Sequence, residues 1–126
     1  MSLVNNQHKD PKDSCRADIW WVSLDPTKGS EIQKTRPCVI INTDSVMALP
    51  VRLVVPLTDW KQHKESNFWC VTIEPTIRNG LEKKVVADIS QTRTVSIERL
   101  ESRIGFLTAE LVEEIVASMV TYIEYE

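Results

Sequence analysis

The sequence predicts a small, mainly β domain, in which a strongly bent antiparallel sheet, closed or nearly closed, is followed by one C-terminal helix. Five short apolar runs, rich in β-branched and aromatic residues, are separated by polar turns, as strands are. After residue 107 the apolar residues recur at three- and four-residue spacing, which is the pattern of an amphipathic helix. A length of 126 residues fits one domain, and short strands with a single helix favour a bent sheet whose opening the helix covers.

Proline and turn signals mark the boundaries of several predicted strands. Asp25-Pro26 closes the first strand, Pro37 is confined to the start of the second, and Asn79-Gly80 marks a turn before the fifth. Residues 96–103 are expected to form a short helical turn. The strands are predicted at residues 18–24, 36–43, 51–58, 68–73 and 84–94.

The terminal helix is predicted over about residues 108–123. Thr108 is a good N-cap, and the glutamates of the early turns suit the positive end of the helix dipole. Residues 1–17 are polar and lack periodicity, which predicts a mobile N-terminal arm. Residues 18–126 are therefore predicted to form a single domain.

Composition excludes several classes of protein. A hydrophobic fraction of 42% excludes a disordered chain, and no apolar stretch approaches the roughly 20 residues that cross a bilayer. Residues 1–14 hold no apolar core of a signal peptide, and the three cysteines form neither a CxxC pair nor a metal-ligand spacing. The sequence therefore predicts a cytoplasmic protein without a metal site or a cofactor.

The acidic residues gather at the C-terminus. The formal net charge is −3, but residues 106–126 carry five of the 18 acids and no lysine or arginine. The remaining body has 15 basic and 13 acidic residues, so a basic patch that binds nucleic acid stays open.

The ends of two strands are predicted to bring a cation and a hydroxyl together. If the second and third strands pair as a hairpin across their seven-residue connector, Arg36 lies opposite Thr58. Such residues share a face and have Cβ atoms about 4.5–5.5 Å apart. A guanidinium offers planar donors to phosphate oxygens, and a threonine donates one further hydrogen bond. The pair can cradle a phosphodiester, although an arginine and a threonine at strand ends are also common surface residues.

These residues lie in a stretch that resembles a known family. The run ADIWWVSLDPTKGSEIQKTRPCVIIN, followed by VVPLT and DISQTRTVSIERL, is similar to the MazF/PemK family of toxin endoribonucleases. The likeness extends from about Asp18 to the terminal helix, and its most specific part is DPTKGSE with the RP and the apolar strand that follow.

The resemblance implies an SH3-like antiparallel β-barrel with a C-terminal helix, a homodimer, and a toxin that a cognate antitoxin holds inactive. It further implies metal-independent, sequence-specific cleavage of single-stranded RNA. The ribose 2′-OH would attack the adjacent phosphate and leave a 2′,3′-cyclic phosphate and a 5′-OH. Neither cleavage of DNA nor a membrane partner is expected.

The resemblance also carries site residues over by motif. The catalytic arginine is Arg36 in TRP, the catalytic threonine is Thr58 in PLT, and the loop glutamate is Glu31 in GSE. Gln91 in SQTRT matches a position that lines the RNA groove, and Trp60 is the favoured base-stacking residue. The basic residues that can contact RNA are Lys28, Lys34, Lys61 and Arg93, together with Arg52 and Lys64, and solvated surface charge is the alternative for each.

Two other functions stay open from the sequence alone. The structurally similar CcdB toxins poison DNA gyrase through an aromatic end of the C-terminal helix, for which Tyr122 and Tyr125 are a small counterpart. The acidic tail IEYE lacks the expected Trp-Gly-Ile ending. A non-catalytic SH3-like binding module is the other alternative.

Overall fold

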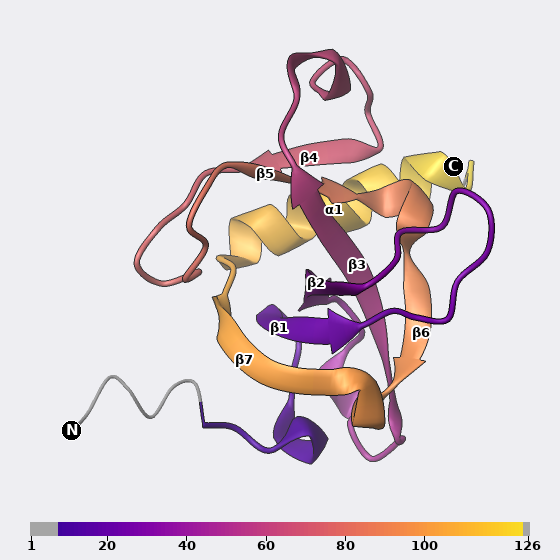
Figure 1. Ribbon diagram of the computed structural model, residues 1–126. Coiled ribbons are helices and arrows are strands. Elements are labelled where there is room, and N and C mark those ends of the chain that lie inside the picture. Colours follow the sequence, from indigo (N-terminus) through magenta and orange to yellow (C-terminus); the bar gives the residue numbers. More distant parts are fainter. Residues whose placement is uncertain (1–7, 125–126) are drawn as a thin grey trace.

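A computed structural model describes residues 8–124 as one strongly twisted antiparallel sheet with a single α-helix lying across it (Figure 1). The mainly β class with a C-terminal helix, predicted from the sequence, is thereby confirmed. The strands are β1 (Asp18–Ser23), β2 (Thr35–Ile40), β3 (Val51–Asp59), β4 (Cys70–Ile73), β5 (Val85–Asp88), β6 (Arg93–Ser96) and β7 (Leu100–Phe106), and the helix is α1 (Ala109–Tyr122).

Strand β3 organises the sheet. The strands follow the order β4-β5-β3-β2-β1-β7, and β6 also pairs with β3. Because Val54 pairs with Ile40 of β2 and with Arg93 of β6, β2 and β6 lie on opposite edges of β3. Among the described strands no pairing joins β4 to β7, so the sheet is open and the word barrel applies to it only loosely.

The sequence prediction was wrong about the last strands. The expected strand at 84–94 is divided into β5 and β6 by a short 3-10 turn, Ile89–Gln91, which Asp88 caps through its carboxylate. The expected helical turn at 96–103 is only Ile97–Arg99, and β7 begins directly after it. β7 was missed because three polar residues in succession, Glu101–Arg103, interrupt its apolar residues; its pairing with β1 makes it a strand.

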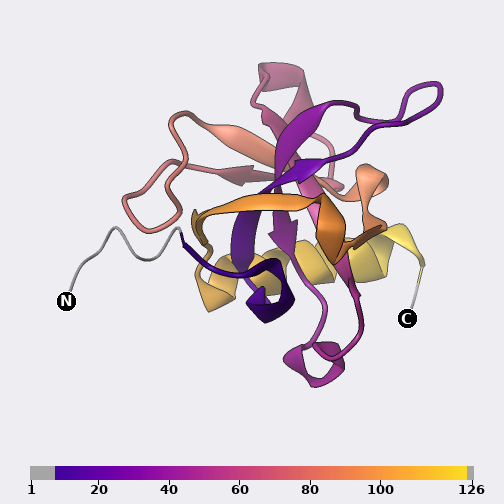
Figure 2. The ribbon, with the colours of Figure 1, turned by 60° about the horizontal axis from the view of Figure 1, so that its bottom comes forward.

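Two apolar clusters lie on the two faces of the sheet. One contains Val39, Val55 and Leu57 and is covered by α1, which contributes Val112 and Ile115. The other contains Trp20, Cys38 and Val54 in the concave interior of the bent sheet. Helix α1 begins where its cap predicts, because the Thr108 hydroxyl accepts a hydrogen bond from the Leu111 N–H at 3.3 Å. Figure 2 shows the helix lying below the sheet.

Residues 9–17, which belong to the predicted arm, contact the body of the protein at two buried charges. The Asp18 carboxylate accepts hydrogen bonds from Lys9, Cys15 N–H, Trp20 and Arg103 at 3.0–3.2 Å. The buried Arg52 guanidinium donates to the carbonyls of Lys12 and Ser14. Residues 1–7 of the predicted arm lie outside the described residues.

The pairing of β2 with β3 has the register that the alternation predicts. Cys38 lies opposite Pro56, Val39 opposite Val55, and Ile40 opposite Val54. Continuing this register by two residues sets Arg36 against Thr58. The observed β2–β3 pairs end at Cys38 and Pro56, and Thr58 pairs with Val86 of β5 on the opposite edge of β3.

Candidate active site

Arg36 and Thr58 lie at the end of the β2–β3 hairpin, on the face that continues from the concave cluster. Both side chains are half-buried. Arg36 Nε donates to the Gln33 carbonyl at 3.3 Å, and its two terminal nitrogens make no hydrogen bond within residues 8–124. Those nitrogens are therefore available to an anion from outside. We call Arg36, Thr58 and the neighbouring Lys64 the polar corner.

Lys64 enters the polar corner from the loop between β3 and β4. Its ammonium donates to Thr58 Oγ1 at 3.2 Å and to the Asp59 carbonyl at 3.0 Å. A hydrogen bond from Lys83 is the main reason why the pKa of Asp59 lies below its ordinary value, and the charges of Arg36 and Lys64 lower it further. Both cations therefore act on the carboxylate of the residue that follows Thr58, and Lys64 also contacts Thr58 itself.

A cavity of about 170 Å³ lies between the β1–β2 loop and the segment that joins β5 to β6, and its wall includes Pro56, Glu31 and Gln91 but none of the three residues of the polar corner. Pro56 precedes Thr58 by two residues, so the two lie about 7 Å apart on one face of β3. Glu31 is exposed in the loop between β1 and β2, and its carboxylate accepts a hydrogen bond from the Lys28 N–H at 2.6 Å. The contact closes a local turn around Gly29, whose φ of +58° favours glycine.

Gln91 and Arg93 hold the β1–β2 loop against the sheet. The Gln91 side chain accepts from the Ile32 N–H at 3.0 Å and donates to the Ser30 carbonyl at 3.4 Å. Arg93 donates to the Leu24 carbonyl at 3.0 Å. In Figure 2 this loop and the β3–β4 loop both project from the side of the sheet away from α1. Gln91, which the resemblance places along an RNA groove, and Arg93, a candidate contact to RNA phosphates, thus both support the loop that carries Glu31.

Removing the two hydrogen bonds of the Gln91 side chain should loosen the β1–β2 loop locally. Gln91→Met should raise the hydrogen-exchange rate of the Ile32 amide by at least about tenfold, because that N–H loses its acceptor. Amides in the core of β2 and β3 should be unchanged. Gln33→Met is the matched control, since Gln33 is exposed in the same loop and its side chain makes no hydrogen bond in the described chain. Equal hydrogen-exchange rates of the Ile32 amide in the two variants would contradict the role of Gln91 in holding the loop.

The other basic candidates divide into exposed and buried. Lys28 and Lys34 are exposed in the β1–β2 loop, and Lys61 is exposed at the start of the β3–β4 loop. Arg52, in contrast, is 1% exposed and donates only to Ser14 Oγ and to backbone carbonyls. The structure therefore corrects the interpretation of Arg52 as a contact to RNA phosphates.

Trp60 is half-buried and contacts the side chains of Glu65 and Lys84. Its indole N–H donates to Glu65 at 3.0 Å, and the Lys84 ammonium lies 4.1 Å from the ring centroid. A base could therefore stack only on the ring face opposite Lys84. Sequence reasoning missed Lys84, because its separation from Trp60 follows no strand or helix period.

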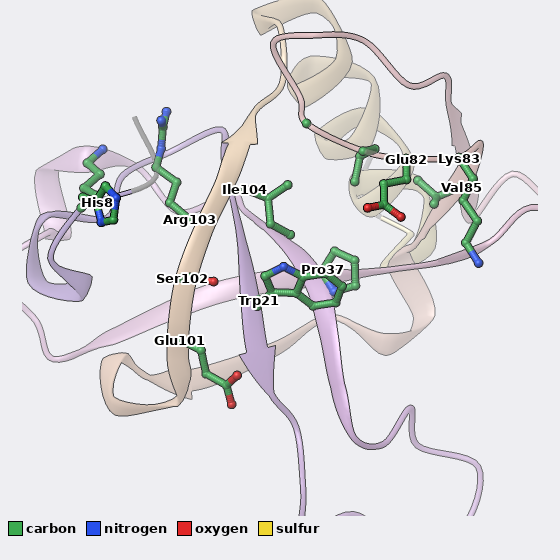
Figure 3. Close-up of a pocket in the computed structure, with 13 residues that line it drawn as sticks. His8, Trp21, Pro37, Glu82, Lys83, Val85, Glu101, Ser102, Arg103 and Ile104 are labelled. Atoms are coloured by element: carbon green, nitrogen blue, oxygen red, sulfur yellow. The ribbon is translucent and has the colours of Figure 1, made fainter. Parts of the chain in front are cut away.

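A second, larger cavity lies on the opposite face of β2, because Pro37 points away from the face of Arg36. Its volume is about 580 Å³. Figure 3 shows the indole of Trp21 beside Pro37, with Lys83 and Glu101 at its borders. Trp21 is 42% exposed, whereas Trp20 is fully buried, as expected for neighbours on opposite faces. Because the polar corner is on the other face, this cavity does not contain the predicted catalytic pair.

The described part of the chain has neither a cluster of His, Cys, Asp or Glu that could hold a metal ion nor a helix long and apolar enough to cross a membrane. Burial raises the pKa of the Cys38 thiol to about 12. Burial also raises the pKa of Cys70, and the charge of Asp88 adds to this effect.

Comparison with known proteins identifies the family. Residues 15–122 match the model of the PemK-like, MazF-like toxins of type II toxin-antitoxin systems. Endoribonuclease MazF9 of Mycobacterium tuberculosis is 35% identical over 100 residues, covering 75% of this chain and 82% of the relative. Endoribonuclease PemK of Escherichia coli is 35% identical over 86 residues, covering 66% of this chain and 61% of the relative.

Solved structures show the same fold. The Mycobacterium tuberculosis toxin MazF-mt6 aligns with a TM-score of 0.70 at 22% identity, covering 86% of this chain and 98% of that chain. A mycobacterial endoribonuclease in complex with its cognate antitoxin also aligns with a TM-score of 0.70, at 15% identity, over 90% of this chain and 97% of that chain. The chain belongs to the PemK/MazF family of toxins of type II toxin-antitoxin systems.

Proposed function

We propose that this toxin-family protein is an endoribonuclease that cuts single-stranded RNA at the polar corner, without a metal ion and with a preference for particular sequences. The single observation that supports the proposal is the β2–β3 register, whose last pair is Cys38 with Pro56 and which, extended by two residues, sets Arg36 opposite Thr58. The two curated relatives named endoribonucleases support the enzyme class over a gyrase poison or a silent binding module. Tyr125, part of the gyrase alternative, lies outside the described residues.

The proposed reaction is an in-line transesterification. The ribose 2′-oxygen loses its proton to a base and forms a bond to phosphorus, while the bond from phosphorus to the 5′-oxygen breaks and that oxygen gains a proton. The products are a 2′,3′-cyclic phosphate and a 5′-OH. The Arg36 guanidinium stabilises the charge that develops on the phosphate, and Thr58 donates a hydrogen bond to a non-bridging oxygen.

Glu31 is the proposed base, since a carboxylate can accept the proton of the 2′-OH whereas a guanidinium stays protonated. It lines the same cavity as Pro56, which precedes Thr58 by two residues on β3. We further propose that Gln91, Arg93, Trp60, Lys28, Lys34 and Lys61 line the path of the RNA. Their positions on the β1–β2 loop, the β3–β4 loop, the 3-10 turn Ile89–Gln91 and β6 support this path.

The proposal extends to partners. A related endoribonuclease has been solved with its cognate antitoxin, which supports an antitoxin partner here. Exposed apolar side chains at the end of α1, Val120, Tyr122 and Ile123, offer a surface to a second copy in a homodimer. A cytoplasmic location agrees with an RNA substrate.

The test is to incubate the purified protein with mixed single-stranded RNA in the presence of a chelator and to sequence the ends that carry 5′-OH. We expect cleavage at recurrent sequences, and no cleavage of an oligonucleotide with 2′-deoxyribose at the cut site, because the nucleophile is then missing. Cleavage of that oligonucleotide, or 5′-phosphate ends, would contradict the mechanism. Inhibition of gyrase supercoiling without RNA cleavage would favour the gyrase alternative.

A further inference from the structure

Lys64 is less exposed to solvent than its neighbours in the β3–β4 loop. It ends a 3-10 turn, Gln62–Lys64, and it is half-buried, whereas residues 61–63 and 65–66 are exposed. Its N–H donates to the Lys61 carbonyl at 2.9 Å, and its carbonyl accepts from the Asn67 N–H at 3.1 Å. These bonds fix the backbone of Lys64 so that its side chain returns to the end of β3.

Side chains outside the 3-10 turn also hold the β3–β4 loop in place. Glu65 accepts a hydrogen bond from the Trp60 indole at 3.0 Å and lies 3.8 Å from the Lys84 ammonium. The Lys64 ammonium then reaches two oxygens of consecutive residues, Thr58 Oγ1 and the Asp59 carbonyl. Two acceptors on the same strand end hold the ammonium in one place.

The direction of the Thr58–Lys64 hydrogen bond has a chemical consequence. An ammonium can only donate, so Thr58 Oγ1 must be the acceptor, and the hydroxyl proton of Thr58 must point elsewhere. Donation by a cation into a hydroxyl oxygen also polarises the O–H bond and strengthens it as a donor. Thr58 is thereby prepared to donate toward an anion that enters the polar corner.

We propose that Lys64 is a positioning residue of this enzyme: its ammonium fixes the Thr58 hydroxyl as a donor aimed at a non-bridging oxygen of the scissile phosphate. The inference rests on the proposed function. It assigns to Lys64 an action through Thr58, as distinct from the contact to backbone phosphates that an exposed loop lysine would make.

The test compares Lys64→Met with the wild type in two assays. In cleavage of a short RNA, kcat should fall about tenfold or more while KM changes by less than about threefold, because the lost interaction acts on the reacting phosphate. In binding of an uncleavable 2′-deoxy analogue, the slope of log affinity against log salt should stay unchanged. A lysine that neutralises a phosphate of single-stranded nucleic acid would lower that slope by about 0.7.

Further variants make the test specific. Lys64→Arg keeps a cationic donor and should recover most of the lost kcat. Lys12→Met removes an exposed charge at the opposite end of the molecule, and Gln62→Met alters the same turn; both should retain wild-type kcat within about twofold. If Lys64→Met fails to fold, Lys64→Gln, which keeps a neutral donor, should show an intermediate kcat.

Each outcome separates the hypotheses. An unchanged kcat for Lys64→Met, a lower salt slope, or no recovery in Lys64→Arg overturns the positioning role while the ribonuclease proposal stands. A wild-type protein that cuts no RNA overturns the proposed function itself. A lower kcat with unchanged KM and slope supports the inference.

Discussion

Alanine at Arg36 is expected to lower the rate of RNA cleavage by at least about a thousandfold, because enzymes of phosphoryl transfer lose about that much or more without the arginine that stabilises the transition state. The protein should stay folded. Within residues 8–124 the Arg36 side chain makes one hydrogen bond, to the Gln33 carbonyl, so the free energy of unfolding should change by less than about 1 kcal/mol. Initial rates on end-labelled RNA and a urea titration measure the two quantities.

Thr58→Ala tests the other half of the pair and should lower the rate by about 10²–10³-fold, the usual cost of one lost donor to a developing oxyanion. Arg36→Lys should recover little, since an ammonium lacks the planar fork of a guanidinium. Arg78→Ala is the charge-matched control: Arg78 is exposed in the β4–β5 loop, and the rate should not change. A wild-type rate in either the Arg36 or the Thr58 variant would show that the chemistry lies elsewhere.

Asp18→Asn is expected to lower the free energy of unfolding by about 3 kcal/mol. The Asp18 carboxylate is 2% exposed and pairs with Lys9 at 3.0 Å and Arg103 at 3.1 Å. A neutral amide removes the negative charge that both cations face at a carboxylate shielded from water. A loss of this size is a large part of the 5–15 kcal/mol of a typical domain. Urea unfolding followed by tryptophan fluorescence measures it.

Asp13→Asn is the matched control for Asp18→Asn. Asp13 is exposed in the 3-10 turn that precedes β1, and its substitution should change the free energy of unfolding by no more than about 0.5 kcal/mol. Equal stability of the two variants would mean that the buried carboxylate does not hold the N-terminal segment to β1 and β7.

Alternation along two strands was enough to predict the register that matters most. The apolar residues of β2 and β3 had to share the face that α1 covers, and a shift by one residue would have turned Val39 and Val55 toward the concave side. The connector of β2 and β3 is short, so few registers were available. The pairing of Val39 with Val55 could therefore be predicted before any coordinates were known, and the opposition of Arg36 and Thr58 two residues beyond the last observed pair stays a prediction.

Loop contacts could not be predicted in this way. Lys64 and Thr58 are six residues apart across a turn, and Gln91 meets Ile32 from 59 residues away. Neither separation has a period that a pattern could reveal. The burial of Arg52 was also not predictable, because four of its five hydrogen bonds go to backbone carbonyls, which every sequence possesses.

Local periodicity by itself determined the strands that pair early in the chain, the register of β2 with β3 and the terminal helix, because each depends on side chains a few positions apart. Only the tertiary structure decided that β7 is a strand, that the sheet stays open, and that Lys64 reaches Thr58. These features depend on contacts between segments whose relative position is set by packing, and packing is a property of the whole chain.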